Sequence, residues 1–537
     1  MIDDVAAIEG ARQDRATRRD LVRSGVVVSG AYLASRLLGW VRLAVIGAAV
    51  GSARDLDAFF AAFRIPDLLF QLVAAGALSS ALVPIVAALD ARGERRRAWR
   101  VALTLAALLA TALVVLGIGA VLAAPVLVPL ITPGFDADGW ARTVELTRIM
   151  VAAPLFLALG AVATSVLNAH GRFGAAALAP VAYNLAIIAA AAAVALEPGL
   201  GVGVVAIGVV GGATAHLLVQ LGSLLRLGFD PRVGIDPRDG EARRALVLMV
   251  PRAIGLGAGQ ITFVVLVALA STVDVGAVAA YTFAFTLLQI PVGVVGVPLA
   301  VVLLPSLARD VALGDEARYG RLVEASLGVL VFVMVGLAAV GAALAMPTAF
   351  LLFGWGRVAE TTLAATGSAF AAFLLGLPAH GAIAVLARAL YARGDTATPA
   401  AAAVAAVVVN VTLAAALVGP VGLVGLALAI AAGAWLEALG LAVVLQRRTG
   451  TLALRPFVRV GLPSLAAGGV AAVAAVLLVT ALGGWALGAP ERVALVGEAV
   501  LVGGVGLAVY VAAAALLRVE AIGPLLVGLR GALRWRS

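Results

Sequence analysis

The sequence predicts an all-α polytopic membrane protein of about 14 transmembrane helices, arranged as two parallel six-helix lobes followed by two accessory C-terminal helices. Composition, the spacing of apolar runs and an internal repeat support this prediction. The 537 residues are 63% hydrophobic and 12% charged, with a mean hydropathy of +1.12, whereas soluble domains contain about 25% charged residues. Because a membrane span takes about 20 residues, spans and short loops use up this length and no sizeable soluble domain fits.

Apolar runs punctuated by glycine, proline or charged residues follow one another along the whole chain. Each is long enough for a span, and several exceed the bilayer thickness, which predicts tilting or kinks at Pro66, Pro154 and Pro291. The runs cover residues 26–50, 56–90, 99–131, 142–168, 174–195, 201–226, 244–272, 276–308, 319–352, 359–390, 397–417, 419–446, 457–482 and 491–517.

Arginine sets the predicted orientation of these spans. The formal net charge is +9, every basic residue is arginine, and the arginines gather in alternate loops, a pattern typical of cytoplasmic loops rather than of nucleic-acid binding. Both termini are therefore predicted in the cytoplasm, with 1–25 as a cytoplasmic segment that lacks the hallmarks of a signal peptide and 518–537 as a basic tail on the membrane surface. The arginine-rich loops are 92–100, 232–244, 309–321 and 447–455, and the loops 197–201 and 271–276 have almost no basic residue.

An internal repeat divides the chain. VPIVAALDARGERRR at Val83 is similar to LPSLARDVALGDEAR at Leu304, and LNAHG at Leu167 is similar to LYARG at Leu390, with offsets of 221 and 223 residues. Each copy returns six spans later, so the copies have the same orientation, which is typical of transporters. The predicted domains are an N-lobe at 26–226, a basic linker at 227–243, a C-lobe at 244–446 and accessory spans at 457–517.

Covalent chemistry finds little support in the sequence. There is no cysteine, and His170, His216 and His380 are too scattered for a metal motif. No nucleophile–base pair or phosphate-binding loop occurs, so we expect neither an enzyme nor a bound cofactor.

Charged residues inside the first two spans are the main functional signal. Arg36 and Arg42 lie in the first span, and Asp57 and Arg64 share one face of the second. Arginines that extend to the interface, or an ion pair between Asp57 and an arginine, would be structural explanations. Several arginines in neighbouring spans instead favour a site for phosphate groups, which guanidinium groups bind well.

The same segments resemble a known family. SRLLGWVR at Ser35, DAFFAAFRIPDLL at Asp57, GALSSALVPI at Gly76 and PVGVVGVPLAVVLLPSL at Pro291 are similar to signature segments of the MurJ/MviN lipid II flippases, within the multidrug/oligosaccharidyl-lipid/polysaccharide exporter superfamily. The resemblance extends over nearly the whole chain.

The resemblance implies a function and its residues. Undecaprenyl-diphosphate-linked peptidoglycan precursor, lipid II, would move from the inner to the outer leaflet of a bacterial plasma membrane by alternating access of the two lobes. Arg36, Arg42 and Asp57 match the family pattern, and the position of Arg64 is also basic in it; Asp57 would orient Arg64. The last two spans would form a groove for the polyprenyl tail.

The chain also departs from the family pattern. Family members often carry more charged residues at the positions occupied here by Phe70, Gln71, Ala75, Phe285, Thr286 and Gln289. Arg252 and Gln260, eight residues apart in the seventh span, are candidate replacements, although Arg252 also fits an interfacial arginine. His216 and Asn184 fit hydrogen bonds between helices.

Two further functions stay open from the sequence. The reduced charge keeps an exporter of another polyprenyl-linked glycan, or of a drug, as an alternative. A transport-inactive scaffold that recruits cell-wall synthesis proteins through its basic loops is the other, and the arginines within spans argue against it. No ATP-binding motif identifies an energy source.

Overall fold

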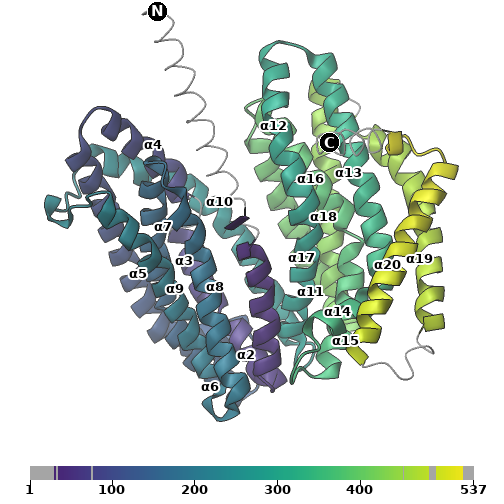
Figure 1. The fold of residues 1–537 in the computed structure, drawn as a ribbon, viewed down its shortest axis with the longest axis horizontal. Coiled ribbons are helices and arrows are strands. Elements are labelled where there is room, and N and C mark those ends of the chain that lie inside the picture. Colours follow the sequence, from purple (N-terminus) through teal and green to yellow (C-terminus); the bar gives the residue numbers. More distant parts are fainter. Residues whose placement is uncertain (1–29, 32–33, 74–76, 451–452, 483–490, 524–537) are drawn as a thin grey trace, which may run out of the picture. The chain divides into compact units, whose positions relative to one another are not determined.

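The computed structural model describes residues 30–31, 34–73, 77–450, 453–482 and 491–523, and these residues form helices with no strand among them (Figure 1). Every predicted apolar run contains at least one helix, so the all-α membrane fold is confirmed. The N-terminal segment 1–25 and most of the basic tail lie outside the described residues.

The first half of the chain forms a long series of helices. The helix at 34–49 is followed by α2 (Ala53–Ala62), α3 (Arg64–Val73), α4 (Ala77–Ala91), α5 (Arg95–Ile131), α6 (Ala137–Met150), α7 (Ala153–Ala169), α8 (Phe173–Leu196), α9 (Gly201–Arg226) and α10 (Gly240–Ser271).

The second half continues in the same way, with two short π-helical turns. It comprises α11 (Ala277–Pro291), the π-helical turn η3 (Val292–Gly296), α12 (Val297–Ala312), α13 (Glu316–Ala343), α14 (Ala345–Phe353), α15 (Glu360–Leu374), α16 (Leu377–Ala392), α17 (Ala397–Val421), α18 (Leu423–Thr449), the π-helical turn η4 (Phe457–Gly461), α19 (Leu462–Leu482) and α20 (Glu491–Leu516).

Within the described residues, 10 segments are long and apolar enough to cross a membrane, or 11 if α15 and α16, bent by 49°, form one broken span. The predicted count of about 14 therefore stays a prediction. The second apolar run is divided among α2, α3 and α4, none of which reaches the length of a span.

The three prolines predicted to kink the spans all lie at helix breaks. Pro66 is in the first turn of α3, directly after the break that ends α2, and Pro154 is in the first turn of α7. Pro291 ends α11, and the π-helical turn η3 begins at the next residue. This is expected because proline lacks the N–H that continues a helix but fits a first turn.

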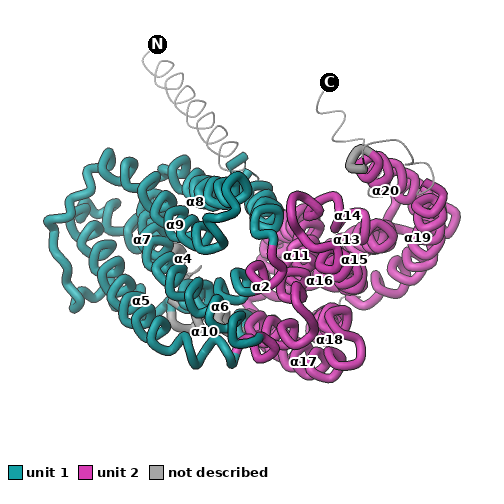
Figure 2. Tube along the Cα trace, turned by 90° about the horizontal axis from the view of Figure 1, so that it is seen from below, with its two compact units in different colours: residues 1–51, 58–130, 136–261 teal, residues 52–57, 131–135, 262–537 magenta. Residues whose placement is uncertain are grey.

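The chain forms two compact units (Figure 2). Unit 1 comprises residues 1–51, 58–130 and 136–261, and unit 2 comprises residues 52–57, 131–135 and 262–537. The change from one unit to the other falls inside α10, later than the predicted start of the C-lobe. The rotational relation between two six-helix lobes stays a prediction.

Basic loops pack on one end of unit 1. Arg97 at the start of α5 forms an ion pair with Asp239 at 3.3 Å, and the Arg100 Nε donates to the carbonyl of Val233 at 3.2 Å. Beside them, Trp99 is buried in the core that α4, α5, α7 and α10 share. The arginine pattern assigns both loops to the same side of the membrane, and the structure places them together.

The accessory helices α19 and α20 lie side by side in unit 2 and pack on α13 (Figure 1). Tyr510 of α20 is buried, stacks on Phe332 and donates its hydroxyl to the Phe332 carbonyl at 2.7 Å. A Cβ atom at Gly336 would lie 2.5 Å from the Tyr510 ring, so this close approach requires glycine.

Loops of unit 2 also contact one another. Arg393, in the loop between α16 and α17, and Glu316, in the arginine-rich loop 309–321, form an ion pair at 2.8 Å. Elsewhere in the unit, the N–H of Gly134 donates to the Ser271 hydroxyl at 3.2 Å, which joins two of the segments that lack basic residues.

Candidate functional site

A cavity of about 340 Å³ lies among the helices of unit 1. It combines apolar side chains with a small number of charged and polar ones, as ligand-binding cavities usually do. Its lining comes from the helix 34–49, from Phe63 between α2 and α3, and from α3, α7, α8 and α9. It comprises Arg42, Phe63, Pro66, Asp67, Phe70, Gln71, Ala153, Pro154, Leu157, Pro180, Tyr183, Val209 and His216.

Arg42 is the arginine of this cavity, and α8 holds it in place. Its Nη1 donates to the Asn184 side-chain oxygen at 3.0 Å, and its guanidinium lies 5.6 Å from the centre of the Tyr183 ring. Asn184 is 5% exposed, and its amide nitrogen donates to the carbonyls of Ser35 at 3.2 Å and Pro180 at 3.0 Å. The predicted interhelical role of Asn184 is confirmed, and its effect is to orient Arg42.

Asp67 supplies the negative charge of the cavity. It interacts electrostatically with Arg64 and Arg42 and accepts a hydrogen bond from Gln71. Asp67 was not among the site residues predicted from the sequence. Its spacing of three residues from Arg64, which places both on one helical face, was the available signal.

His216 joins the cavity from α9. Its ring packs against α7 so closely that a Cβ at Gly160 would lie 2.3 Å from the His216 Nδ1. Gln220 donates to the His216 carbonyl at 3.1 Å and accepts from the Thr164 hydroxyl at 2.7 Å. The histidine therefore belongs to a polar group between α7 and α9, in agreement with the interhelical interpretation, and one edge of it also reaches the cavity.

Asp57 has a role that the sequence did not predict. It is 2% exposed, and its two carboxylate oxygens accept the N–H groups of Gly276 at 2.6 Å and Ala279 at 2.8 Å. Gly276 is the N-cap residue of α11 and Ala279 lies in its first turn. A carboxylate there accepts from otherwise unpaired N–H groups and interacts favourably with the positive end of the helix dipole. Asp57 therefore caps α11 within unit 2, and its predicted role of orienting Arg64 stays a prediction.

The structure separates the remaining predicted site residues. Arg36 is exposed on the helix 34–49 and does not line the cavity, while Arg64 begins α3 beside Asp67 and is partly buried. Gln260 is partly buried in α10. Arg252 lies in the same helix, and its side chain is outside the described part of the structure. The grouping of Arg252 with Gln260 stays a prediction.

The chemistry of the cavity suits a ligand with both an anionic and an apolar part. A guanidinium held by a neutral amide keeps its remaining N–H groups for a phosphate or carboxylate. Phe63 and Phe70 offer an apolar surface beside it. Phe70 and Gln71, both departures from the family pattern, line this same cavity, so the reduced charge changes the site itself.

Known proteins are similar to this chain in sequence and in fold. The family described as "Lipid II flippase MurJ" matches residues 46–493. A lipid II flippase MurJ from Burkholderia cenocepacia is 33% identical over 386 residues, which cover 71% of this chain and 75% of that protein. A probable lipid II flippase MurJ from Rhizobium meliloti is 34% identical over 437 residues, 79% of this chain and 80% of that protein.

Solved structures agree with the sequence matches. A structure titled "Lipid II flippase MurJ, inward closed conformation" has a TM-score of 0.73 at 21% identity and covers 93% of this chain and 100% of that one. An inward-facing multidrug resistance MATE transporter of the MOP superfamily has a TM-score of 0.68 at 18% identity, over 78% of this chain and 95% of that one. The match over most of the chain, together with relatives above 30% identity, shows that this chain belongs to the MurJ family of lipid II flippases.

Proposed function

We propose that this protein flips lipid II and that the cavity around Arg42 receives the diphosphate of the lipid. Family membership supports the overall activity, since the matched relatives are named lipid II flippases. The observation that carries the site is the Arg42 guanidinium, which lines a cavity and is oriented by Asn184.

The charge balance of the cavity fits a site that binds and releases an anion. Asp67 interacts with the positive charges of Arg42 and Arg64 and offsets part of them. A diphosphate would bring more than one negative charge to these arginines, and charge-assisted hydrogen bonds would offset part of its desolvation. Asp67 would oppose overly tight binding, which a transporter has to avoid on the releasing side.

We also propose the membrane, the orientation and the transport mechanism of the chain. The chain would lie in the bacterial plasma membrane with both termini in the cytoplasm, and alternating access of two lobes would move the head group across. The arginine-rich loops support this sidedness. The apolar faces of α19 and α20, with exposed residues such as Val473, Leu477 and Val500, are suited to the polyprenyl tail.

The test compares two arginines of the same helix. Arg42→Ala should fail to support growth of cells depleted of their own flippase. Arg42→Lys should support reduced growth, because lysine keeps the charge but lacks the planar fork of the guanidinium. Arg36→Ala tests whether Arg36, which does not line this cavity, also contributes to substrate binding. Membrane levels are compared by immunoblot.

Binding of lipid II to the purified protein tests the site independently of cell growth. Losing a charged hydrogen bond costs about 1.5–3 kcal/mol, so purified Arg42→Ala should bind lipid II about ten- to a hundredfold more weakly than wild type. Normal growth and normal affinity of Arg42→Ala would place the diphosphate elsewhere.

Export of another polyprenyl-linked glycan is the second candidate, favoured by Phe70 and Gln71 in the cavity lining. Lipid II and undecaprenyl-diphosphate-linked glycans without the peptide, compared on the same purified protein, distinguish the two. Equal transport of both would support the broader substrate class.

A further inference from the structure

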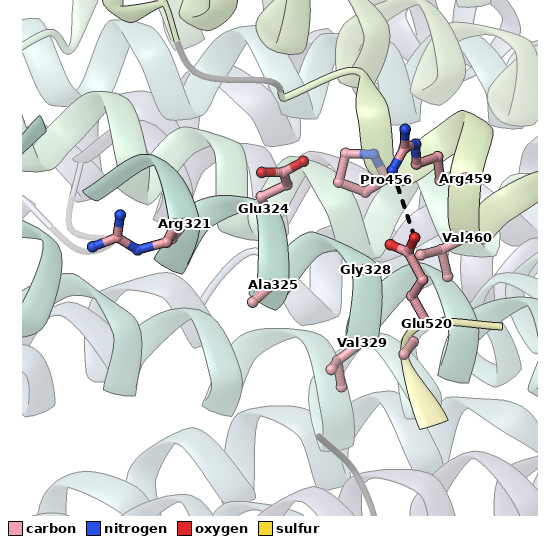
Figure 3. A pocket seen from close by; sticks show the side chains of 10 residues that line it. Arg321, Glu324, Ala325, Gly328, Val329, Pro456, Arg459, Val460 and Glu520 are labelled. Carbon is pink, nitrogen blue, oxygen red and sulfur yellow. Dashed lines mark ion pairs between the residues drawn. The ribbon is translucent and has the colours of Figure 1, made fainter. Parts of the chain in front are cut away.

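A second cavity, of about 240 Å³, lies in unit 2 where α13 meets the start of the accessory helices (Figure 3). It belongs to the end of the unit that carries the arginine-rich loops, because Arg321, Arg455 and Arg459 are all found there. Its lining comprises Arg321, Glu324, Ala325, Gly328, Val329, Pro456, Arg459, Val460, Glu520 and Ala521.

Local backbone features create this hollow. The π-helical turn Phe457–Gly461, which follows Pro456, widens the start of the accessory span, and such turns are frequent at functional sites. Gly328 has no side chain to fill the space opposite, and a Cβ there would only reach van der Waals contact with Val460 at 3.5 Å.

The chain reversal after α20 closes the other side. Val519 donates its N–H to the Ala514 carbonyl at 3.0 Å, and Arg518 donates to that of Ala515 at 3.0 Å, with Arg518 at a φ of 54°. This is a Schellman motif. It turns the chain back so that Ala521 is buried and Glu520 reaches the cavity.

The charged side chains of the cavity differ in how firmly they are paired. Glu324 is occupied by Arg455 at 3.2 Å, while Arg459 approaches Glu520 at only 3.6 Å, with both of these side chains more than half exposed. Arg321 is exposed on α13 and forms no ion pair within the described residues. Figure 3 shows Glu520 directed toward Arg459 and Arg321 projecting from α13. Arg321, and Arg459 in an exposed ion pair with Glu520, are therefore the cations of the cavity lining.

The other walls are apolar and continue into a lipid-facing surface. Ala325, Val329 and Val460 line the cavity. Next to it along the accessory span, Val458 and Leu462 are 59% and 60% exposed, as expected of side chains that face acyl chains. Arginine at the end of an apolar helix marks the level of the lipid head groups.

We propose that this cavity binds an anionic glycerophospholipid of the cytoplasmic leaflet. Arg321 and Arg459 would contact its phosphate, and its first acyl carbons would lie against Ala325, Val329 and Val460. The lining has two arginines and two glutamates, and Arg455 pairs with Glu324, so these residues carry one excess positive charge. This charge favours an anionic occupant, because basic pockets between helices on the cytoplasmic side bind anionic head groups. The bound lipid would join α13 to the accessory pair at the membrane surface.

The test measures lipid binding to the full-length protein by native mass spectrometry after delipidation in detergent. Phosphatidylglycerol and phosphatidylcholine with identical acyl chains are titrated separately. Two arginines near the head group predict about a tenfold preference for phosphatidylglycerol. Arg321→Gln combined with Arg459→Gln should bind the two lipids within about twofold of each other.

Two controls keep the result specific. Arg309→Gln combined with Arg447→Gln removes the same charge from exposed positions outside the cavity and should retain the preference. Ala325→Trp fills the apolar part and leaves both arginines in place, so it should also weaken phosphatidylglycerol binding. Size-exclusion profiles show which variants are folded, and either cavity variant alone suffices for the comparison.

Three outcomes would overturn the proposal. Equal binding of the two lipids by the wild type would exclude selectivity for anionic lipids. A preference that survives in both cavity variants would place the lipid elsewhere. Displacement of bound phosphatidylglycerol by inorganic phosphate alone, with no effect of Ala325→Trp, would indicate a simple anion site.

Discussion

The interiors of the two units differ in what fills them. In unit 1, Phe63 lines a cavity together with Arg42. The residue 222 positions after Phe63 is Phe285, and in unit 2 its ring packs edge-on against Phe263, with ring centres 4.9 Å apart, and near Phe373 at 5.9 Å. A repeat preserves the pattern of helices and leaves the interior free to diverge. A polar cavity persists where charged groups replace packed aromatic rings.

The aromatic cluster predicts the largest loss of stability. Phe373 is fully buried against Tyr281 and Phe285, so Phe373→Ala should lower the free energy of unfolding by about 3–5 kcal/mol. Phe70→Ala in unit 1 should cost less, since it only enlarges an existing cavity. Thermal unfolding of both variants in detergent checks this. Equal losses would mean that the units do not differ in packing.

Asp57 in unit 2 and Arg42 in unit 1 are both charged, and we expect their substitution to have different effects. Asp57→Ala leaves the N–H groups of Gly276 and Ala279 without their acceptor and should cost about 2–3 kcal/mol of unfolding free energy. Asp57→Asn, which keeps one acceptor oxygen, should cost less. Arg42→Gln should instead lose lipid II binding at nearly unchanged stability. A stable Asp57→Ala protein with lost transport would return Asp57 to the substrate site.

Asp57 and Arg42 also show which features of the protein can be predicted from its sequence. Hydropathy, arginine-rich loops and prolines predict the helices and their breaks because each depends on local properties of the chain. Arg42 was predicted as a site residue for the same reason, since an arginine within a span needs an explanation. The partner of Asp57 is the start of a helix 219 residues away, and no local pattern reveals it.

The polar neighbours of Arg42 were the harder part of the site. Tyr183 and Asp67 become site residues only once α3 and α8 pack beside the helix 34–49. Asn184 was recognised as a residue that joins helices, but its partner was not. Periodicity gives the face of a helix and does not identify the helix that the face meets.

Asn184 provides a test of intermediate size within unit 1. Asn184→Ala removes the acceptor that orients the Arg42 guanidinium at 3.0 Å. One such hydrogen bond is worth about 1.5 kcal/mol, so lipid II affinity should fall about tenfold. Asn184→Asp, which keeps the acceptor, should retain more affinity. Unchanged affinity in Asn184→Ala would show that Arg42 is held by other contacts.

The loops between the paired helices of each repeat differ in a smaller way. Arg172 precedes α8 without a side-chain cap, whereas Asp395, 223 positions later, accepts from the Thr398 hydroxyl at 2.7 Å and the Thr398 N–H at 2.9 Å and also pairs with Arg448. The side-chain hydrogen bond from Thr398 is the main cause that lowers the pKa of Asp395 below its ordinary value of 3.8.

The lowered pKa gives this cap a defined pH dependence. Its contribution to stability is present above the unfolded pKa and is lost as the pH falls through the folded pKa. Asp395→Ala should therefore cost about 1 kcal/mol at pH 7, and the gap from wild type should close in acid. Unfolding curves at neutral and acidic pH measure this, with Arg172→Ala expected to have no such effect. A gap that persists in acid would contradict the charge-based cap.

The smallest change in the free energy of unfolding is expected at the end of α20, which differs from the helix ends of the repeat. The equivalent loops of the repeat use Gly171 and Gly394 at positive φ, 68° and 76°, whereas the end of α20 places Arg518 at a φ of 54°. A residue with a Cβ is strained there and glycine is not, so Arg518→Gly should raise the free energy of unfolding by about 0.5–1 kcal/mol. The reciprocal change, Gly394→Arg, should lower it by a similar amount, since no atom crowds that site and only the backbone is strained. Chemical unfolding of the two variants beside wild type decides the sign. A loss of stability in Arg518→Gly would mean that the arginine side chain makes contacts at the end of α20 that outweigh the strain of its backbone.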